Sequence, residues 1–183
     1  MLLALTRPSR SDDLSQLCIT GRQYKPDGVA FLPSSLAKQS RQGKSVSEFF
    51  FPSFPGNSKL CPSTTLKEYE MRTESLRKGE PRLFIAIIKP HGAVTASTIA
   101  RWLKSLLEAA GIDTSIFNAH SIRGASTSKA ANVGITTQDI LKAADWKSES
   151  VFQKFYYKPT EAASYGRAVL RSKKQATNNT VDM

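Results

Sequence analysis

The stretch from Ala119 to Pro159 reads AHSIRGASTSKAANVGITTQDILKAADWKSESVFQKFYYKP and holds most of the side chains that could carry chemistry in this chain. His120 and Arg123 lie three apart at the start of a helical pattern, so both side chains point from one face of the predicted helix. Trp146 follows a second short helical pattern, and Tyr156 lies ten residues further on, in a third. Taken alone, a His-x-x-Arg pair is typical of a helix cap or a surface, so the rest of the chain must support a site.

An arginine with an acidic partner lies near the N-terminus. The run RSDDL begins at Arg10, as the chain turns into a predicted helix, and Asp13 follows at a spacing of three. At that spacing Asp13 is expected to hold the Arg10 guanidinium by a charge-assisted hydrogen bond. Arg7 is the competing arginine, but Pro8 follows it and it lacks an acidic residue at that spacing. Arg10 is therefore the preferred candidate.

The next candidate is a lysine that follows a predicted β-hairpin. Residues 22–31 contain two short strand patterns around Pro-Asp-Gly, which is turn chemistry. Lys38 comes soon after this hairpin, and Lys44 is the alternative. The apolar run of residues 45–54, SVSEFFFPSF, predicts a third strand that closes a small antiparallel sheet.

The remaining elements are predicted to be mainly helical. Pro62 opens a helix that extends to about Arg77. Thr95 caps another, which Gly111 ends. The run PRLFIAII, residues 81–88, predicts a short buried strand. The fold class expected from this pattern is α+β: a mostly helical domain with a small antiparallel sheet.

Composition restricts the function. The 183 residues contain 26 Lys and Arg against 15 Asp and Glu, a formal net charge of +11. Such an excess on a globular chain indicates a polyanionic partner, most simply nucleic acid. Cys18 and Cys61 are too few for a disulfide scaffold and form no metal-ligand cluster with His91 and His120, so buried free thiols are expected. No stretch predicts a membrane span, a secretory signal or a glycine-rich phosphate loop, and neither a metal nor another cofactor is expected.

Six residues in chain order resemble the catalytic set of the tyrosine recombinases of the phage-integrase type: Arg10, Lys38, His120, Arg123, Trp146 and Tyr156. The sequence is most similar to the versions carried by eukaryotic mobile elements, in which Trp replaces a later His. The resemblance covers about residues 2–169. Tyr157 is the alternative nucleophile, because it is adjacent to Tyr156.

The resemblance implies cleavage and rejoining of DNA without a metal. Arg10 and Arg123 would neutralise charge on the non-bridging phosphate oxygens, because an arginine offers a rigid fork of donors and stays protonated. Tyr156 would attack phosphorus and form a 3′-phosphotyrosyl intermediate.

The other three residues would handle protons and hydrogen bonds. His120 would accept the tyrosine proton, and Lys38 would protonate the leaving 5′-oxygen. Trp146 could donate a hydrogen bond from its indole N–H to a phosphate oxygen, but it cannot exchange a proton as a His could.

Domain organisation and partners follow from the same resemblance. Residues 1–169 are expected to form the catalytic domain without the N-terminal helical clamp of the family, and residues 170–183 a disordered polar tail. The partners would be double-stranded DNA and other recombinase protomers, inside the cell and in the nucleus. Two other functions stay open: a catalytically silent DNA-binding remnant of a mobile element, and an enzyme like the type IB topoisomerases.

Overall fold

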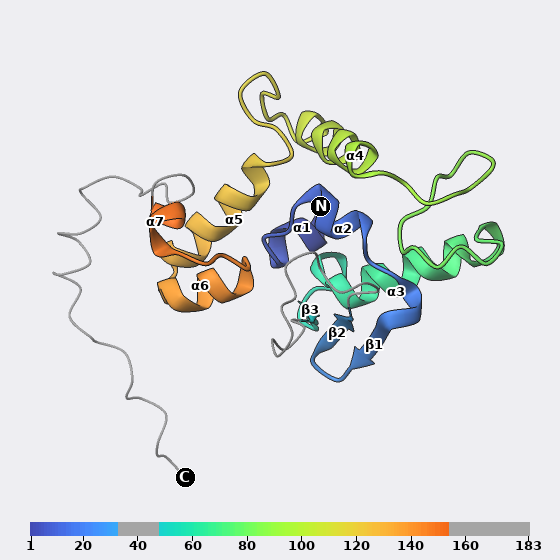
Figure 1. Cartoon of the computed structure of the whole chain (residues 1–183), viewed down its shortest axis with the longest axis horizontal. Coiled ribbons are helices and arrows are strands. Elements are labelled where there is room, and N and C mark those ends of the chain that lie inside the picture. The colour runs from blue at the N-terminus through green and yellow to red at the C-terminus, as the bar shows by residue number, and fades with distance from the viewer. Residues whose placement is uncertain (33–47, 154–183) are drawn as a thin grey trace, which may run out of the picture.

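The computed structural model describes residues 1–32 and 48–153 (Figure 1). The predicted general acid, Lys38, and its alternative Lys44 lie outside the described residues. So do the predicted nucleophile, Tyr156, its neighbour Tyr157, and residues 170–183, for which a polar tail is predicted.

A three-stranded antiparallel sheet forms one part of the fold. Strands β1 (Arg22–Lys25), β2 (Gly28–Phe31) and β3 (Phe49–Pro52) lie in the order β1-β2-β3, so β2 is central and buried along its whole length. The predicted hairpin is confirmed, because Arg22 pairs with Phe31 and Lys25 with Gly28. Gly28 is required by close approach: a Cβ atom there would lie 2.4 Å from the carbonyl oxygen of Phe51 on the next strand.

Helices account for most of the remaining regular structure. They are α1 (Leu2–Thr6), α2 (Ser11–Ser15), α3 (Pro62–Thr73), α4 (Ala96–Ala109), α5 (Ser121–Asn132), α6 (Thr137–Ala143) and α7 (Glu149–Val151), with short 3₁₀ turns at Ile19–Gly21, Ser58–Leu60 and Glu74–Leu76. Helices α3 and α4 begin where the sequence predicts: Pro62 is the first residue of α3, and the hydroxyl of Thr95 accepts the N–H of Thr98 at 3.3 Å at the start of α4. The predicted α+β class with a small antiparallel sheet is therefore confirmed. None of the described helices is long and apolar enough to cross a membrane.

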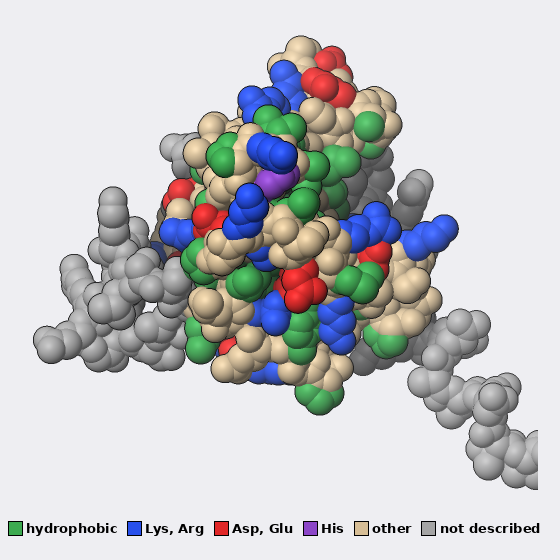
Figure 2. Space-filling view, turned by 90° about the vertical axis from the view of Figure 1, so that its right-hand side faces the viewer, with side chains coloured by type: hydrophobic (Ala, Val, Ile, Leu, Met, Phe, Trp, Pro, Cys, Tyr) green, Lys and Arg blue, Asp and Glu red, His purple; other side chains and the backbone are tan. Residues whose placement is uncertain are grey.

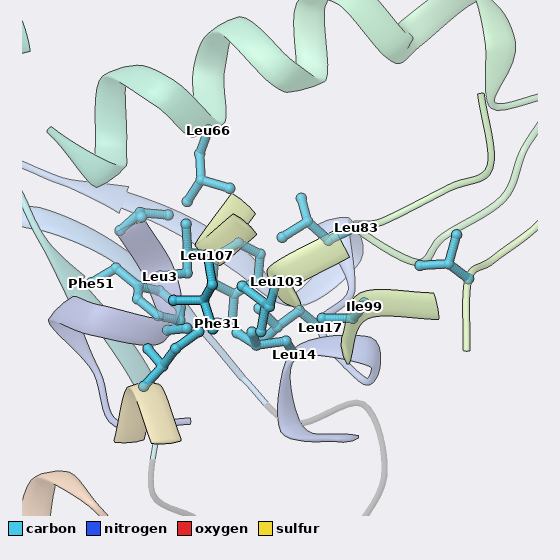
Figure 3. Close-up of a cluster of buried hydrophobic side chains, with 14 residues drawn as sticks. Leu3, Leu14, Leu17, Phe31, Phe51, Leu66, Leu83, Ile99, Leu103 and Leu107 are labelled. Carbon is cyan, nitrogen blue, oxygen red and sulfur yellow. The ribbon is translucent and has the colours of Figure 1, made fainter. Parts of the chain in front are cut away.

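The hydrophobic core lies where α1, α2 and α4 meet the sheet and α3 (Figure 3). Helix α4 contributes Ile99, Leu103 and Leu107, which repeat every four residues and so form one stripe. This stripe packs against α2, whose Leu14 is buried in the same cluster, as is Leu17 just beyond the helix. The short α2 is thus held by packing rather than by its own length.

The prediction of a buried strand at residues 81–88 is wrong. Only isolated bridges form there, between Cys18 and Arg82 and between Ile85 and Ala93. The backbone N–H groups find other partners: that of Leu83 donates to the carbonyl of Leu17 at 2.7 Å, and that of Ile85 donates to the hydroxyl of Tyr69. The apolar run therefore forms an extended segment, of which Leu83 and Ile85 are buried and residues 87 and 88 are exposed.

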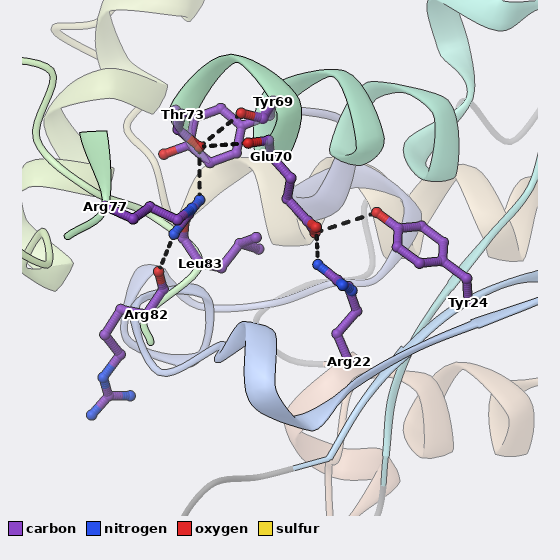
Figure 4. Close-up of polar contacts among 8 residues, drawn as sticks. All are labelled: Arg22, Tyr24, Tyr69, Glu70, Thr73, Arg77, Arg82 and Leu83. Atoms are coloured by element: carbon purple, nitrogen blue, oxygen red, sulfur yellow. Dashed lines mark hydrogen bonds and ion pairs between the residues drawn. The ribbon is translucent and has the colours of Figure 1, made fainter. Parts of the chain in front are cut away.

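The buried Arg77 connects the extended segment 81–88 to the end of α3 by hydrogen bonds (Figure 4). The guanidinium of Arg77 donates to the carbonyl oxygens of Arg82 at 2.7 Å and Leu83 at 2.8 Å, and to the hydroxyl of Thr73 at 2.9 Å. These acceptors are neutral, so hydrogen bonds rather than an ion pair compensate the burial of this charge.

Helices α5, α6 and α7 gather on one side of α1 and α2, with the sheet and α3 on the other (Figure 1). Helix α5 packs against α1: Ile122 joins the core, and the hydroxyl of Ser126 donates to the carbonyl of Leu5. Helix α6 packs on α5 and α7 on α6. This arrangement brings the first turn of α5 next to the connection between α1 and α2.

Candidate functional site

A polar cleft lies between the α1–α2 connection and the turn that follows α6. Residues from distant parts of the chain line it: Arg7, Pro8, Ser9, Arg10, Asp13, Phe49, Arg123, Ala143, Ala144 and Asp145. Both arginines predicted to clamp a phosphate are among them. The fold therefore brings Arg10 and Arg123 to one cleft, although more than a hundred residues separate them in the sequence.

Arg10 reaches the cleft from the start of α2. It is the N-cap residue of this helix, and its side chain is exposed. The carboxylate of Asp13 accepts the backbone N–H of Arg10 at 2.7 Å, which differs from the predicted contact with the guanidinium. The reason is that an acidic residue at the third helical position is well placed for the unpaired N–H at the helix start. Asp13 therefore fixes the turn that carries Arg10.

Arg123 lies in the first turn of α5 and is buried. Its Nη2 donates a hydrogen bond to the carbonyl oxygen of Ala144, in the turn after α6. The centre of its guanidinium also lies 4.7 Å from the centroid of the Trp146 ring. Trp146 packs in turn against Phe152, with ring centroids 5.7 Å apart. The aromatic pair and the turn together orient the guanidinium.

His120 is the N-cap residue of α5, one turn before Arg123. Burial lowers the pKa of its imidazole below 6.5, and the positive charges of Arg123 and Arg10 lower it further. Both effects disfavour the charged form. The surroundings therefore favour the neutral imidazole, which is the form that can accept a proton.

Arg7 is a third arginine of the cleft, and the sequence spacing did not reveal its partners. Its guanidinium lies 4.3 Å from the centroid of the Phe49 ring. Burial lowers the pKa of Arg7, whereas the nearby carboxylates of Asp13 and Asp145 raise it. Asp145 comes from the far end of the described chain, so no local pattern could have predicted this neighbour.

Four of the six predicted site residues are thus close together: Arg10, His120, Arg123 and Trp146. The positions of Lys38 and Tyr156 are not described, but described residues flank both segments. Phe49, the second residue after the segment 33–47, lines the cleft.

The two cysteines are free and buried, as predicted. The Cys61 thiol accepts the N–H of Phe54 at 3.2 Å. That contact, followed by hydrogen bonds from residues 63 and 64 at the start of α3, lowers the pKa of the Cys61 thiol to about 7. Within residues 1–32 and 48–153, no three His, Cys, Asp or Glu side chains form a group that could hold a metal ion.

On the face shown in Figure 2, positive side chains do not form a single block. Figure 2 shows Lys and Arg side chains distributed over one face of the molecule among hydrophobic and neutral ones.

Comparison with known proteins identifies the fold. The sequence matches no model of a protein family and no curated protein. The structure is similar to that of the XerA recombinase, with a TM-score of 0.68 and 17% sequence identity over 94% of this chain and 55% of that one. It is also similar to the XerH site-specific recombinase in a post-cleavage complex with a palindromic difH substrate, with a TM-score of 0.66 and 16% identity over 93% of this chain and 44% of XerH.

A third similar structure is the Tn1549 transposon integrase in complex with circular intermediate DNA, with a TM-score of 0.57 and 15% identity over 93% of this chain and 56% of the integrase. The chain spans about half the length of these three proteins. The chain therefore has the fold found in tyrosine recombinases and integrases, as the resemblance in the sequence predicted.

Proposed function

We propose that this chain, with its recombinase fold, cleaves and rejoins duplex DNA through a 3′-phosphotyrosyl intermediate. One observation carries the proposal: Arg10 and Arg123 line a single cleft, with His120 and Trp146 beside them. The same four residues belong to the set that resembles the catalytic residues of the tyrosine recombinases in the sequence.

The two arginines suit the charge of the reaction. When a phosphodiester is attacked, negative charge builds on its non-bridging oxygens, and a guanidinium offers paired donors to two oxygens at once. In other phosphoryl-transfer enzymes one well-placed arginine contributes roughly 10³–10⁵ in rate. Arg123 is held by Ala144 and by the ring of Trp146, so little reorganisation would be needed when a phosphate binds.

The proton transfers are assigned to three residues. The phenol oxygen of Tyr156 forms a bond to phosphorus, while the bond from phosphorus to the 5′-oxygen breaks. A free tyrosine has a pKa of about 10, so its proton must pass to an acceptor, and neutral His120 fills this role. Lys38, or Lys44 in its place, protonates the departing 5′-oxygen. Rejoining is the reverse of these steps.

Trp146 is assigned a hydrogen bond and a packing role. Its indole N–H donates to a phosphate oxygen, and its ring supports the guanidinium of Arg123. An indole N–H is not acidic enough to exchange a proton, so the acid and base steps stay with His120 and the lysine.

The substrate is proposed to be duplex DNA at the end of a mobile element, bound by several protomers of the chain in the nucleus. Two described features support a DNA partner: the net charge of +11 and a cleft in which arginines outnumber carboxylates.

The test is covalent capture. The purified chain is incubated with nicked duplexes that represent the DNA flanking its gene, and the products are separated on a denaturing gel. A protein–DNA band that resists denaturation is expected, and Arg123→Gln should reduce it at least 100-fold. The control Arg72→Gln, an exposed arginine on α3, should leave it unchanged. DNA binding without a covalent band would instead identify a silent DNA-binding remnant.

A further inference from the structure

The connection between α1 and α2 contributes more to the cleft than Arg10. Arg7, Pro8 and Ser9 line the cleft as well, and the chain there is fixed by Pro8 and by the contact of the Arg7 guanidinium with the ring of Phe49. Arg7 is therefore not an arginine that moves freely in solvent. It is held at the wall of the cleft beside Arg10.

The charges that line the cleft match a single phosphodiester. Three arginines (7, 10 and 123) and two aspartates (13 and 145) line it, which leaves a formal charge of +1. One DNA phosphodiester carries a charge of −1. With Arg10 and Arg123 alone, the two carboxylates would cancel both positive charges, so the excess that attracts an anion depends on Arg7.

Ser9 supplies an independent observation. It lines the same cleft and is only 8% exposed. Its hydroxyl is buried and has no hydrogen-bond partner among the described residues. A buried hydroxyl without a partner is costly, and an anion in the cleft would provide an acceptor for it.

We propose that Arg7 and the hydroxyl of Ser9 are two further ligands of the DNA phosphodiester that occupies this cleft. The inference rests on the proposed function, because it names additional groups that hold the same phosphate. Arg7 supplies the third guanidinium, and Ser9 donates through its O–H to a non-bridging oxygen. Burial lowers the pKa of Arg7, and the carboxylates of Asp13 and Asp145 act against that effect.

The test is a binding cycle that needs no cleavage. A duplex carries one methylphosphonate, in which a methyl group replaces a charged non-bridging oxygen, and this group is moved one phosphate at a time across the bound site. At the phosphate in the cleft, the substitution should weaken binding of the unmodified chain about tenfold. It should weaken binding of Arg7→Gln by less than about threefold, because the partner of the lost charge is already absent.

Controls separate binding from folding. Arg72→Gln removes an equal charge outside the cleft and should keep the full tenfold effect. Ser9→Ala should leave the midpoint of urea unfolding unchanged or raise it, because an unpaired buried hydroxyl is removed, and should weaken DNA binding about fivefold. Arg7→Lys keeps the charge without the fork, and should bind between the unmodified chain and Arg7→Gln.

The results distinguish this inference from the proposed function. If the unmodified chain forms no covalent band but Arg7 and one methylphosphonate are coupled in binding, the inference holds and the cleavage proposal fails. The inference is overturned if a covalent band forms but Arg7→Gln and the methylphosphonate weaken DNA binding independently of each other at every position. In that case the methylphosphonate weakens binding of Arg7→Gln by the same factor as binding of the unmodified chain. Unchanged DNA binding by Ser9→Ala would remove Ser9 from the site.

Discussion

The imidazole of His120 lies beside two arginines, and these neighbours determine its protonation state. Because burial and the charges of Arg123 and Arg10 all disfavour an added proton, its pKa lies below 6.5. We expect an NMR titration to give a midpoint below 6.5 for His120, and Arg10→Gln to raise it, since one repelling charge is lost. The chain has two histidines, so the imidazole signal that disappears in His91→Gln belongs to His91 and the remaining one to His120. A midpoint at or above 6.5 would contradict the lowered pKa of His120.

Trp146 allows its hydrogen bond to be tested apart from its packing. Trp146→Phe keeps a ring beside Arg123 but removes the indole N–H. A hydrogen bond to a charged group contributes about 1.5–3 kcal/mol, so single-turnover cleavage should slow by about 10- to 100-fold while the urea midpoint changes little. Trp102→Phe on α4, where the ring packs against the core, is the matched control and should cleave normally. Equal rates for Trp146→Phe and the unmodified chain would leave Trp146 with a packing role alone.

At the scale of residues, sequence reasoning found the arginines and His120 but not their neighbours. Arg10 could be selected because its acidic partner is local, three positions on. The neighbours of Arg7 could not be predicted from the sequence. Asp145 comes close to Arg7 only because α6 packs on α5 and α5 packs on α1. The contact that Asp13 makes was also misassigned, since a helix start offers a backbone N–H that competes for the carboxylate.

At the scale of elements, the junction of α3 with residues 82–85 depends on Arg77. Arg77→Lys would retain the charge but lose most of the three hydrogen bonds that the guanidinium makes to Thr73, Arg82 and Leu83. Because Arg77 is buried, we expect a loss of about 2–4 kcal/mol in the free energy of unfolding, measured by urea denaturation. Arg72→Lys, at an exposed position near the end of α3, should change it by less than about 0.5 kcal/mol. A similarly small loss of unfolding free energy for Arg77→Lys would show that the junction does not depend on the hydrogen bonds of the guanidinium.

Elements with local signals were predicted well. The hairpin at 22–31 follows from its turn residues, and the starts of α3 and α4 follow from Pro62 and Thr95. Residues 81–88 were misassigned because an apolar run shows burial but not the partner of its backbone. Here the partners are a loop carbonyl and a tyrosine hydroxyl, which only the tertiary fold supplies.

At the scale of the whole molecule, the net charge predicts a salt dependence. If the chain neutralises about five phosphates on duplex DNA, the logarithm of the association constant should fall with the logarithm of salt concentration at a slope of roughly −4 to −5. Fluorescence anisotropy at four or more salt concentrations measures it. Binding that is tight and unchanged by salt would show that the surface charge in Figure 2 is not the basis of DNA affinity.

The identity of the linked residue tests the central claim most directly. The covalent protein–DNA species is digested with protease and nuclease, and the peptide that carries the residual nucleotide is sequenced by mass spectrometry. The account predicts attachment at Tyr156 through a 3′-phosphate, with Tyr156→Phe abolishing the species and Tyr157→Phe retaining it. Attachment at Tyr157 would move the nucleophile by one residue. Attachment at any other residue, or through a 5′-phosphate, would contradict the account.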